Sequence, residues 1–358
     1  MLVEPAVPAP ESRPFWLGWP GDQPYLTRKR VVLILSVLAT LLLAALGLSA
    51  SVGNVPLRWH EVFWGAPGNV DRVIFFETRL PRIALAAIVG AALAVAGATL
   101  QGLLRNPLAE PHLIGVSGGA ALGATLAVAI GGRFVLAKMW LLPLAAGVGA
   151  LVSVALLYRI SLVQGRLQPH VLLLAGVVYN AFAGAVILCV NYIADFYQAQ
   201  GLLSWLIGNV AGYGYDLIGP AAVYCGLASL WLCVQARGLD LLSLGEESAW
   251  QMGVNVDRVR RVAFLGSSLL VGAVVAISGM IGFVGLIVPH ALRVLCGADH
   301  RLLLPAAALG GAIFLVLADT IARSIAPGVE IPVGVVTALA GGPFFLYLLR
   351  REQRRLYF

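Results

Sequence analysis

The sequence predicts an all-α, polytopic membrane protein with ten transmembrane helices. Of its 358 residues, 60% are hydrophobic and only 11% are charged, and the mean hydropathy is +0.90. A soluble domain carries roughly 25% charged residues, so most of this chain requires an apolar solvent. A helix of about 20 apolar residues crosses a bilayer core about 30 Å thick. The apolar segments are too long and continuous for the alternating strands of a membrane barrel.

Ten windows of the chain have this length and composition. In order, they are 31–50, 82–103, 113–131, 139–160, 170–194, 217–236, 260–277, 280–296, 302–325 and 332–349. We therefore expect one transmembrane domain over residues 31–350. Residues 1–30 contain six prolines and end in three basic residues, which predicts a cytoplasmic proline-rich tail and a charge anchor without a cleavable signal peptide. Residues 351–358 form a second, basic tail.

The distribution of positive charge predicts the orientation. Cytoplasmic loops of membrane proteins hold an excess of Lys and Arg. If both termini are cytoplasmic, their side holds 17 of the 24 Lys and Arg residues. Arg79, Arg82 and Arg323 oppose this trend, because they fall at outer helix ends. Such arginines can extend toward lipid phosphates, or they can face an acidic partner outside the membrane.

The sequence offers little for catalysis. No GxxxxGK[ST] loop is present, and the chain has only two lysines, Lys29 and Lys138, so we expect no ATP hydrolysis by this chain. An HExxH motif is also missing. The four cysteines lack metal-ligand spacing, so we expect small buried hydrophobic residues and no metal site; they are Cys189, Cys225, Cys233 and Cys296.

Few ionisable residues fall inside the spans, although an ion-coupled transporter would need them. Asp319 precedes Arg323 by four residues, which predicts an ion pair near the outer end of one helix. We expect His290 to be structural. Asp195 lies at the edge of a span.

The longest inner loop, 236–261, contains the segment SLGEESAWQMG. We expect a short helix here, with Glu246 and Glu247 in its first turn and Gly253 as its stop. A short helix that is connected to the bundle at both ends is suited to transmitting a force to the bundle. An ordinary solvated loop is the alternative.

Two further patterns concern the packing of helices and a translocation path for the substrate. Gly115, Gly119 and Gly123 follow a spacing of four residues, which favours close helix contact, either as tight packing or as a sliding seam. The fifth span carries polar groups that could face a translocation path, namely Tyr179, Asn180, Asn191 and Tyr192. An aromatic series in the fifth span and the following outer loop is typical of an interfacial belt or of a lining for a flat substrate; it comprises Tyr192, Phe196, Tyr197, Trp205, Tyr213 and Tyr215.

Over nearly all of residues 31–350, the chain resembles the permease subunit of type II ABC importers for heme, cobalamin and iron-siderophores. The motifs that carry the resemblance occur in the family's order, and they are RLPR (79–82), NPLAEPHLIGVSGGAALGA (106–124), LLLAG (172–176), LGEESAWQMG (244–253), GFVGLIVPHALR (282–293), DHRLLLP (299–305) and EIPVGVVTALAGGPFF (330–345).

The resemblance implies a homodimer in the bacterial inner membrane, with its path along the two-fold axis. Two ATPase subunits, which hold ATP and Mg, would dock on the cytoplasmic face, and a periplasmic binding protein would dock outside. Arg79, Arg82 and Arg323 match the family's outward arginines that meet glutamates of the binding protein. The segment that couples to the ATPase would comprise Gly245, Glu246, Glu247, Ser248, Ala249 and Gly253; Ser248 departs from the family's Glu-Ala-Ala pattern.

The substrate is less well defined. The segment 106–124 looks closer to heme and cobalamin permeases than to siderophore permeases, and we expect heme as the transported substrate, with cobalamin or a ferric siderophore as alternatives. No role follows for His112. The competing functions are an ion-coupled secondary transporter that acts alone and a membrane scaffold without transport.

Overall fold

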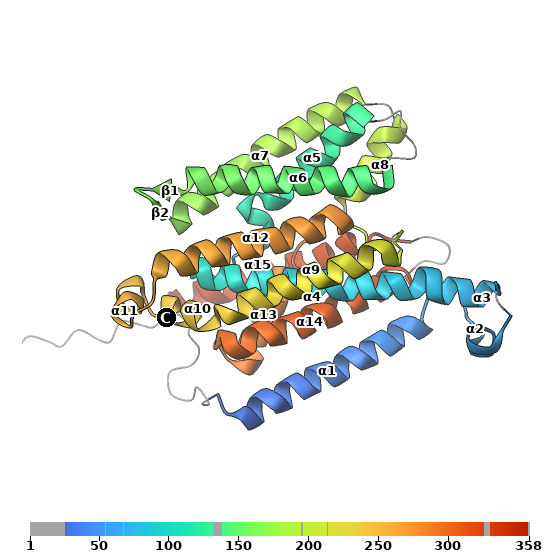
Figure 1. Cartoon of the computed structure of the whole chain (residues 1–358), viewed down its shortest axis with the longest axis horizontal. Coiled ribbons are helices and arrows are strands. Elements are labelled where there is room, and N and C mark those ends of the chain that lie inside the picture. The colour runs from blue at the N-terminus through green and yellow to red at the C-terminus, as the bar shows by residue number, and fades with distance from the viewer. Residues whose placement is uncertain are drawn as a thin grey trace, which may run out of the picture.

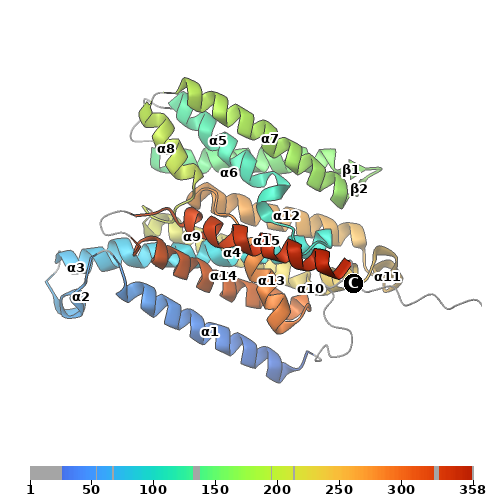
Figure 2. The same ribbon diagram turned by 180° about the vertical axis from the view of Figure 1, so that it is seen from behind.

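The computed structural model describes residues 26–356, apart from 54, 67, 132–137, 195, 213 and 326–329. Its long helices run roughly parallel to one axis and form a bundle (Figure 1). The N-terminal end of α1 lies toward the same end of the bundle as α11 (Glu246–Gln251) and the C-terminal end of α15. Helices α2 and α8 lie at the opposite end (Figure 2). We call these the α11 end and the α8 end.

Each predicted window corresponds to one helix, namely α1 (Arg28–Ser51), α4 (Leu80–Leu104), α5 (Val116–Gly131), α6 (Lys138–Ile160), α7 (Pro169–Ile193), α9 (Tyr215–Val234), α12 (Val256–Ser278), α13 (Val284–Cys296), α14 (His300–Ala322) and α15 (Val333–Leu356). Seven helices of the described chain are long and apolar enough to cross a membrane, whereas α5, α13 and the apolar part of α15 are shorter. Helix α1 begins at Arg28, and α15 continues to Leu356, so both helices extend into residues that we expected to be tails.

Several short elements were not predicted. At the α8 end these are α2 (Trp59–Trp64), α3 (Val70–Val73), the π-helical turn η2 (Ile74–Arg79) and α8 (Phe196–Leu206). At the α11 end, α10 (Ala236–Ser243) precedes α11, and β1 (Leu162–Val163) pairs antiparallel with β2 (Arg166–Leu167). The intervening Gln164 and Gly165 both have positive φ, at 52° and 78°, as a two-residue hairpin turn requires.

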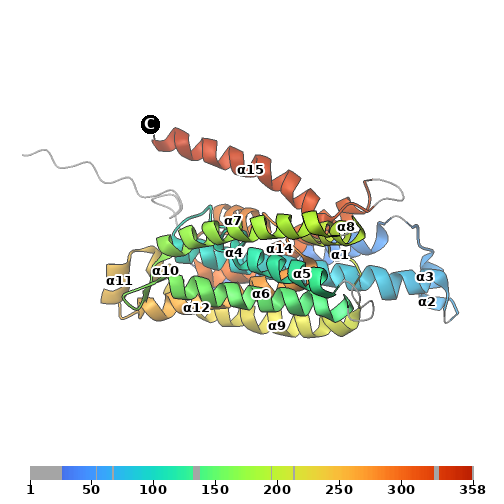
Figure 3. The same ribbon diagram turned by 90° about the horizontal axis from the view of Figure 1, so that it is seen from above.

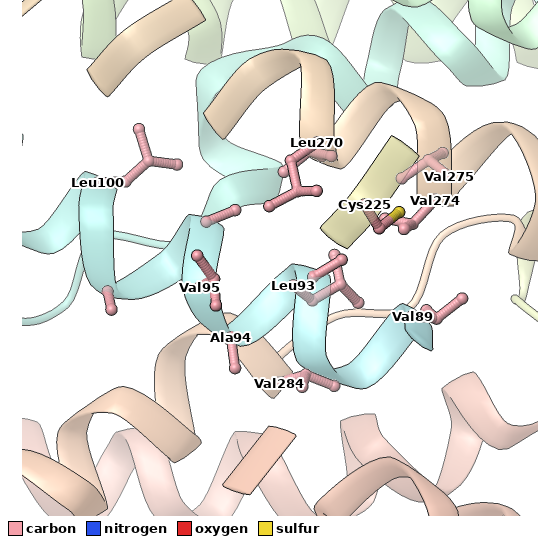
Figure 4. Packing of buried hydrophobic residues seen from close by; sticks show 14 of the residues in the cluster. Val89, Leu93, Ala94, Val95, Leu100, Cys225, Leu270, Val274, Val275 and Val284 are labelled. Atoms are coloured by element: carbon pink, nitrogen blue, oxygen red, sulfur yellow. The ribbon is translucent and has the colours of Figure 1, made fainter. Parts of the chain in front are cut away.

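Helix α4 lies at the centre of the core and is buried along most of its length (Figure 4). Its side chains pack against residues of α9, α12 and α13. Small residues permit the closest contacts: a Cβ at Gly97 would collide with the backbone of Gly285, and one at Gly90 would collide with the backbone of Gly311. In lipid, such backbone approach is a principal means of helix association.

Helices α5, α6 and α7 form a group beside this core (Figures 1 and 3). Gly119 and Gly123 of α5 face the backbone of α6, which confirms the tight packing expected there. Gly115, however, lies just before α5 and not within it, although a Cβ there would also meet α6, at Leu157. It ends the 3₁₀ helix η3 (Pro111–Ile114) and has a φ of +87°.

The prediction that all four cysteines are buried was partly wrong, because Cys189 is exposed.

Candidate functional sites at the two ends of the bundle

A buried ion pair joins α4 to α14 at the α8 end. Arg82 donates from Nε and Nη2 to Oδ1 of Asp319, at 3.0 and 2.9 Å, and from Nη1 to Glu330 at 2.6 Å. The side chains of Arg82 and Asp319 are only 7% and 1% exposed. Two buried charges in this geometry hold the helix ends together, because separating them would leave each charge desolvated and unpaired.

The other two arginines lie in the same cluster. Arg323 approaches Asp319 at 3.5 Å, as the spacing of four residues predicts, and also donates to the carbonyl and hydroxyl of Ser49. Arg79 donates to the carbonyls of Ala50 and Val55, both at 2.8 Å. All three arginines are therefore buried and bonded within the chain. The cluster of three arginines, Asp319 and Glu330 carries one excess positive charge.

An open cavity of about 640 Å³ lies at the α11 end. It is lined on one side by α11 and on the other by the first turn of α12 and by β2, through Arg166, Gln168, Glu246, Glu247, Trp250, Gly253, Val254, Asn255, Val256, Asp257 and Arg260. The predicted short helix is confirmed here, with Glu246 and Glu247 in its first turn. Gly245 and Gly253 flank it with positive φ, at 125° and 81°, which is why glycine suits both positions.

Helix α11 is anchored on one face and exposed on the other. Ala249 is buried, and Glu246 forms an ion pair with the buried Arg260 of α12. Glu247 and Ser248 are exposed. Trp250 is 74% exposed, and Leu244 and Met252, which flank α11 in the sequence, are 57% and 50% exposed. We call Leu244, Trp250 and Met252 the α11 patch. Sequence reasoning missed these three residues, although large apolar side chains beside charged ones were the available signal.

The candidate path residues all lie on α7, but in different surroundings. Asn180 donates from Nδ2 to the carbonyl of His112 at 2.8 Å, and Asn191 donates to the carbonyl of Ile187 in its own helix. Tyr179 lies beside Gly115. Tyr192 is 93% exposed. Thus Asn180 stabilises the segment between α4 and α5 by a hydrogen bond, whereas Tyr192 lies on an exposed face of α7.

The three members of the aromatic series whose side chains the structure describes lie in different surroundings. Tyr215 donates from its hydroxyl to the carbonyl of Phe76 at 2.7 Å, and Trp205 packs beside the core from α8. Tyr213 and Asp195 lie outside the described residues. His290 is buried and makes an edge contact with Phe344, with ring centroids 6.0 Å apart.

A bundle with seven helices that are long and apolar enough to cross a membrane defines the class of polytopic membrane proteins. The chain belongs to the FecCD transport family, whose match covers residues 41–351. It is 41% identical over 323 residues to the hemin transport system permease protein of Yersinia pestis, covering 89% of this chain and 96% of the relative. It is 43% identical over 312 residues to a cobalamin import system permease protein of Halobacterium salinarum, covering 85% and 82%.

A solved structure agrees with this assignment. The chain superimposes with a TM-score of 0.78 and 36% identity on an inward-facing transporter described as a metal-chelate type ABC transporter, covering 89% of this chain and 99% of that one. The resemblance seen in the sequence is thereby confirmed. The protein is a multi-pass permease of an ABC importer, and its role is transport.

Proposed function

We propose that this permease imports heme from the periplasm into the cytoplasm by alternating access. It works as a homodimer in the bacterial inner membrane, with two ATPase subunits at the α11 end and a periplasmic binding protein at the α8 end. Both termini are then cytoplasmic. ATP and Mg are held by the ATPase subunits, and heme is cargo.

The α11 patch carries this proposal. Three large apolar side chains stand exposed on a short segment whose other face is buried in the bundle. Exposed aromatic residues of this kind are typical centres of protein interfaces. Because Glu246 is paired with Arg260 of α12, a force applied to α11 reaches a long helix of the bundle. The docking segment comprises Gly245, Glu246, Glu247, Ser248, Ala249 and Gly253.

The arginine cluster supports docking at the opposite end. Arg79, Arg82 and Arg323 leave one positive charge uncompensated within their cluster, and this charge favours an acidic partner. Because the three guanidinium groups are bonded within the chain, direct pairing with glutamates of the binding protein requires some of these bonds to exchange. If these hydrogen bonds do not exchange, the net positive charge of the cluster attracts the acidic partner without direct contact.

The open faces of α7 and α15 favour a second copy of the chain. Phe182 and Tyr192 of α7 are 61% and 93% exposed, and Leu339 and Tyr347 of α15 are 72% and 61% exposed. In a homodimer such faces enclose the path between the subunits. We assign Tyr192 and, more deeply, Tyr179, Asn180 and Asn191 to the neighbourhood of this path.

Heme is supported by the hemin permease relative, and the similar identity to a cobalamin permease keeps cobalamin as the second candidate. The test is uptake into liposomes that contain the permease, its co-purified ATPase and the binding protein. We expect ATP-dependent accumulation of hemin that excess cobalamin or ferric citrate does not inhibit. Accumulation of cobalamin instead would exclude heme, and uptake driven by an ion gradient without ATPase would exclude the ABC mechanism.

A further inference from the structure

Hydrogen bonds of its ring and of its backbone carbonyl fix the position of His112. Its Nε2 lies 2.7 Å from the carbonyl oxygen of Ile281, in the break between α12 and α13. Its own carbonyl accepts the bond from Asn180 of α7. Two residues earlier, Glu110 accepts a hydrogen bond from the backbone N–H of Phe283. The segment that carries His112 is therefore bonded to both α7 and the 279–283 break.

These bonds determine the tautomer of the imidazole. A carbonyl oxygen can only accept, so Nε2 must carry the proton and donate it to Ile281. In the neutral ring, Nδ1 is then unprotonated and keeps its lone pair. Within the described residues, no hydrogen bond is formed to Nδ1, and the side chain of His112 is partly exposed.

The ring orientation directs this lone pair away from the break. A Cβ built on Gly282 would lie 3.8 Å from Cδ2 of His112, and Nε2 faces Ile281. The edge formed by Cδ2 and Nε2 thus faces residues 281–282, and the edge that contains Nδ1 faces the other way. On one side of His112 is α7, and on the other the break packs against α15 at Gly334 and Gly341.

A histidine that donates one ring N–H to a backbone carbonyl has the arrangement common to metal-ligating histidines, because that bond fixes the ring and raises the basicity of the other nitrogen. Imidazole suits iron, and histidine is an ordinary axial ligand of heme iron. We propose that Nδ1 of His112 binds the iron of a metalloporphyrin in transit. The nitrogen lone pair forms the bond to ferric iron, and a water at its axial position leaves.

This inference rests on heme as the proposed substrate. The test distinguishes failure of the role of His112 from failure of the proposed substrate. The permease–ATPase complex, with its binding protein, is reconstituted as the native chain and as His112→Gln. Glutamine can place an amide N–H near the position of Nε2 and keep the bond to Ile281, but it offers no imidazole. The probes are hemin and metal-free protoporphyrin IX. Glu110→Gln, which retains an acceptor for Phe283, is a control on the same segment.

We expect His112→Gln to lower hemin uptake about tenfold and to abolish the Soret shift that the native complex produces in hemin, with protoporphyrin uptake unchanged. Glu110→Gln should keep the shift. Equal hemin uptake and an equal spectrum in His112→Gln would overturn the inference. An equal loss of both porphyrins would also overturn it, since it would assign His112 a purely structural role. If the native complex does not import hemin, the proposed substrate itself is wrong.

Discussion

Arg82 and Asp319 lie 237 residues apart in the sequence and form a two-pronged ion pair between α4 and α14, with Nε and Nη2 of the arginine 3.0 and 2.9 Å from Oδ1 of the aspartate. The pair is buried, and Arg323 and Glu330 extend it on either side. It connects a helix near the beginning of the chain to one near its end. Its removal should therefore affect the whole fold.

Asp319→Asn should destabilise the protein by about 3 to 5 kcal/mol, because Arg82 would lose the partner of a buried charge. The measurement is the thermal midpoint of the purified protein in detergent. Arg166→Gln is the matched control: Arg166 and Asp257 also form an ion pair, at 3.8 Å, but they are 72% and 40% exposed. An exposed pair contributes about 0 to 1 kcal/mol. Equal midpoints for the two variants would contradict a structural role of the buried pair.

The close contact of α4 with α13 predicts a strong effect of a single methyl group. Gly97→Ala would place a Cβ against the backbone of Gly285, which cannot move aside as a side chain can. Overpacking of this kind costs about 1 to 3 kcal/mol. Gly147→Ala is the control, because Gly147 lies within α6 and a Cβ there meets nothing within 4 Å; it should be neutral or stabilising. Thermal midpoints should fall for Gly97→Ala alone.

The α11 patch can be tested with a pair of tryptophans. Trp250 and Trp64 are 74% and 75% exposed and lie at opposite ends of the bundle. Trp250→Ala should weaken binding of the ATPase about thirtyfold or more, because truncation of a central interface residue costs about 2 kcal/mol or more. Co-purification of the ATPase and ATP-driven uptake should fall accordingly. Trp64→Ala should leave co-purification of the ATPase intact. Loss of the ATPase in both variants, or in neither, would argue against docking at α11.

The arginine cluster predicts a salt-dependent association with the binding protein. Arg79 is the best probe, because in the part of the chain that the structure describes its guanidinium donates to two backbone carbonyls and pairs with no carboxylate. Arg79→Gln should slow capture of the binding protein at low ionic strength, whereas the difference from the native permease should shrink near 1 M salt, where the Debye length is about 3 Å. Arg79→Lys, which keeps the charge, serves as the control. Association that is independent of salt in the native protein would argue against a role of the arginine cluster in docking.

The fold could be predicted largely from the number and length of the apolar segments in the sequence. Each of the ten windows contains a helix, because a segment in lipid must satisfy its backbone polar groups internally. Helix α11 was also predictable, since its glycines and acidic first turn are local signals. The exposure of Trp250 was not, because it depends on which face of α11 packs against the bundle.

Long-range contacts account for the other differences. The pairing of Asp319 with Arg323 follows from one turn of helix, whereas its pairing with Arg82 depends on the packing of α4 against α14. The same packing buries arginines that we expected at the surface. The contact of His112 with Ile281 likewise joins segments 169 residues apart, and no periodicity in the sequence could indicate it.

The central position of α4 has a consequence for synthesis of the protein. This helix enters the membrane second among the long apolar helices, yet its partners α12, α13 and α14 are translated only after residue 255. Until then, the glycine and alanine residues of α4 that contact these three helices face lipid or provisional neighbours. Assembly must therefore postpone closure of the core until the ribosome has nearly finished, and a chain truncated before α14 should be recognised by membrane quality control as incomplete.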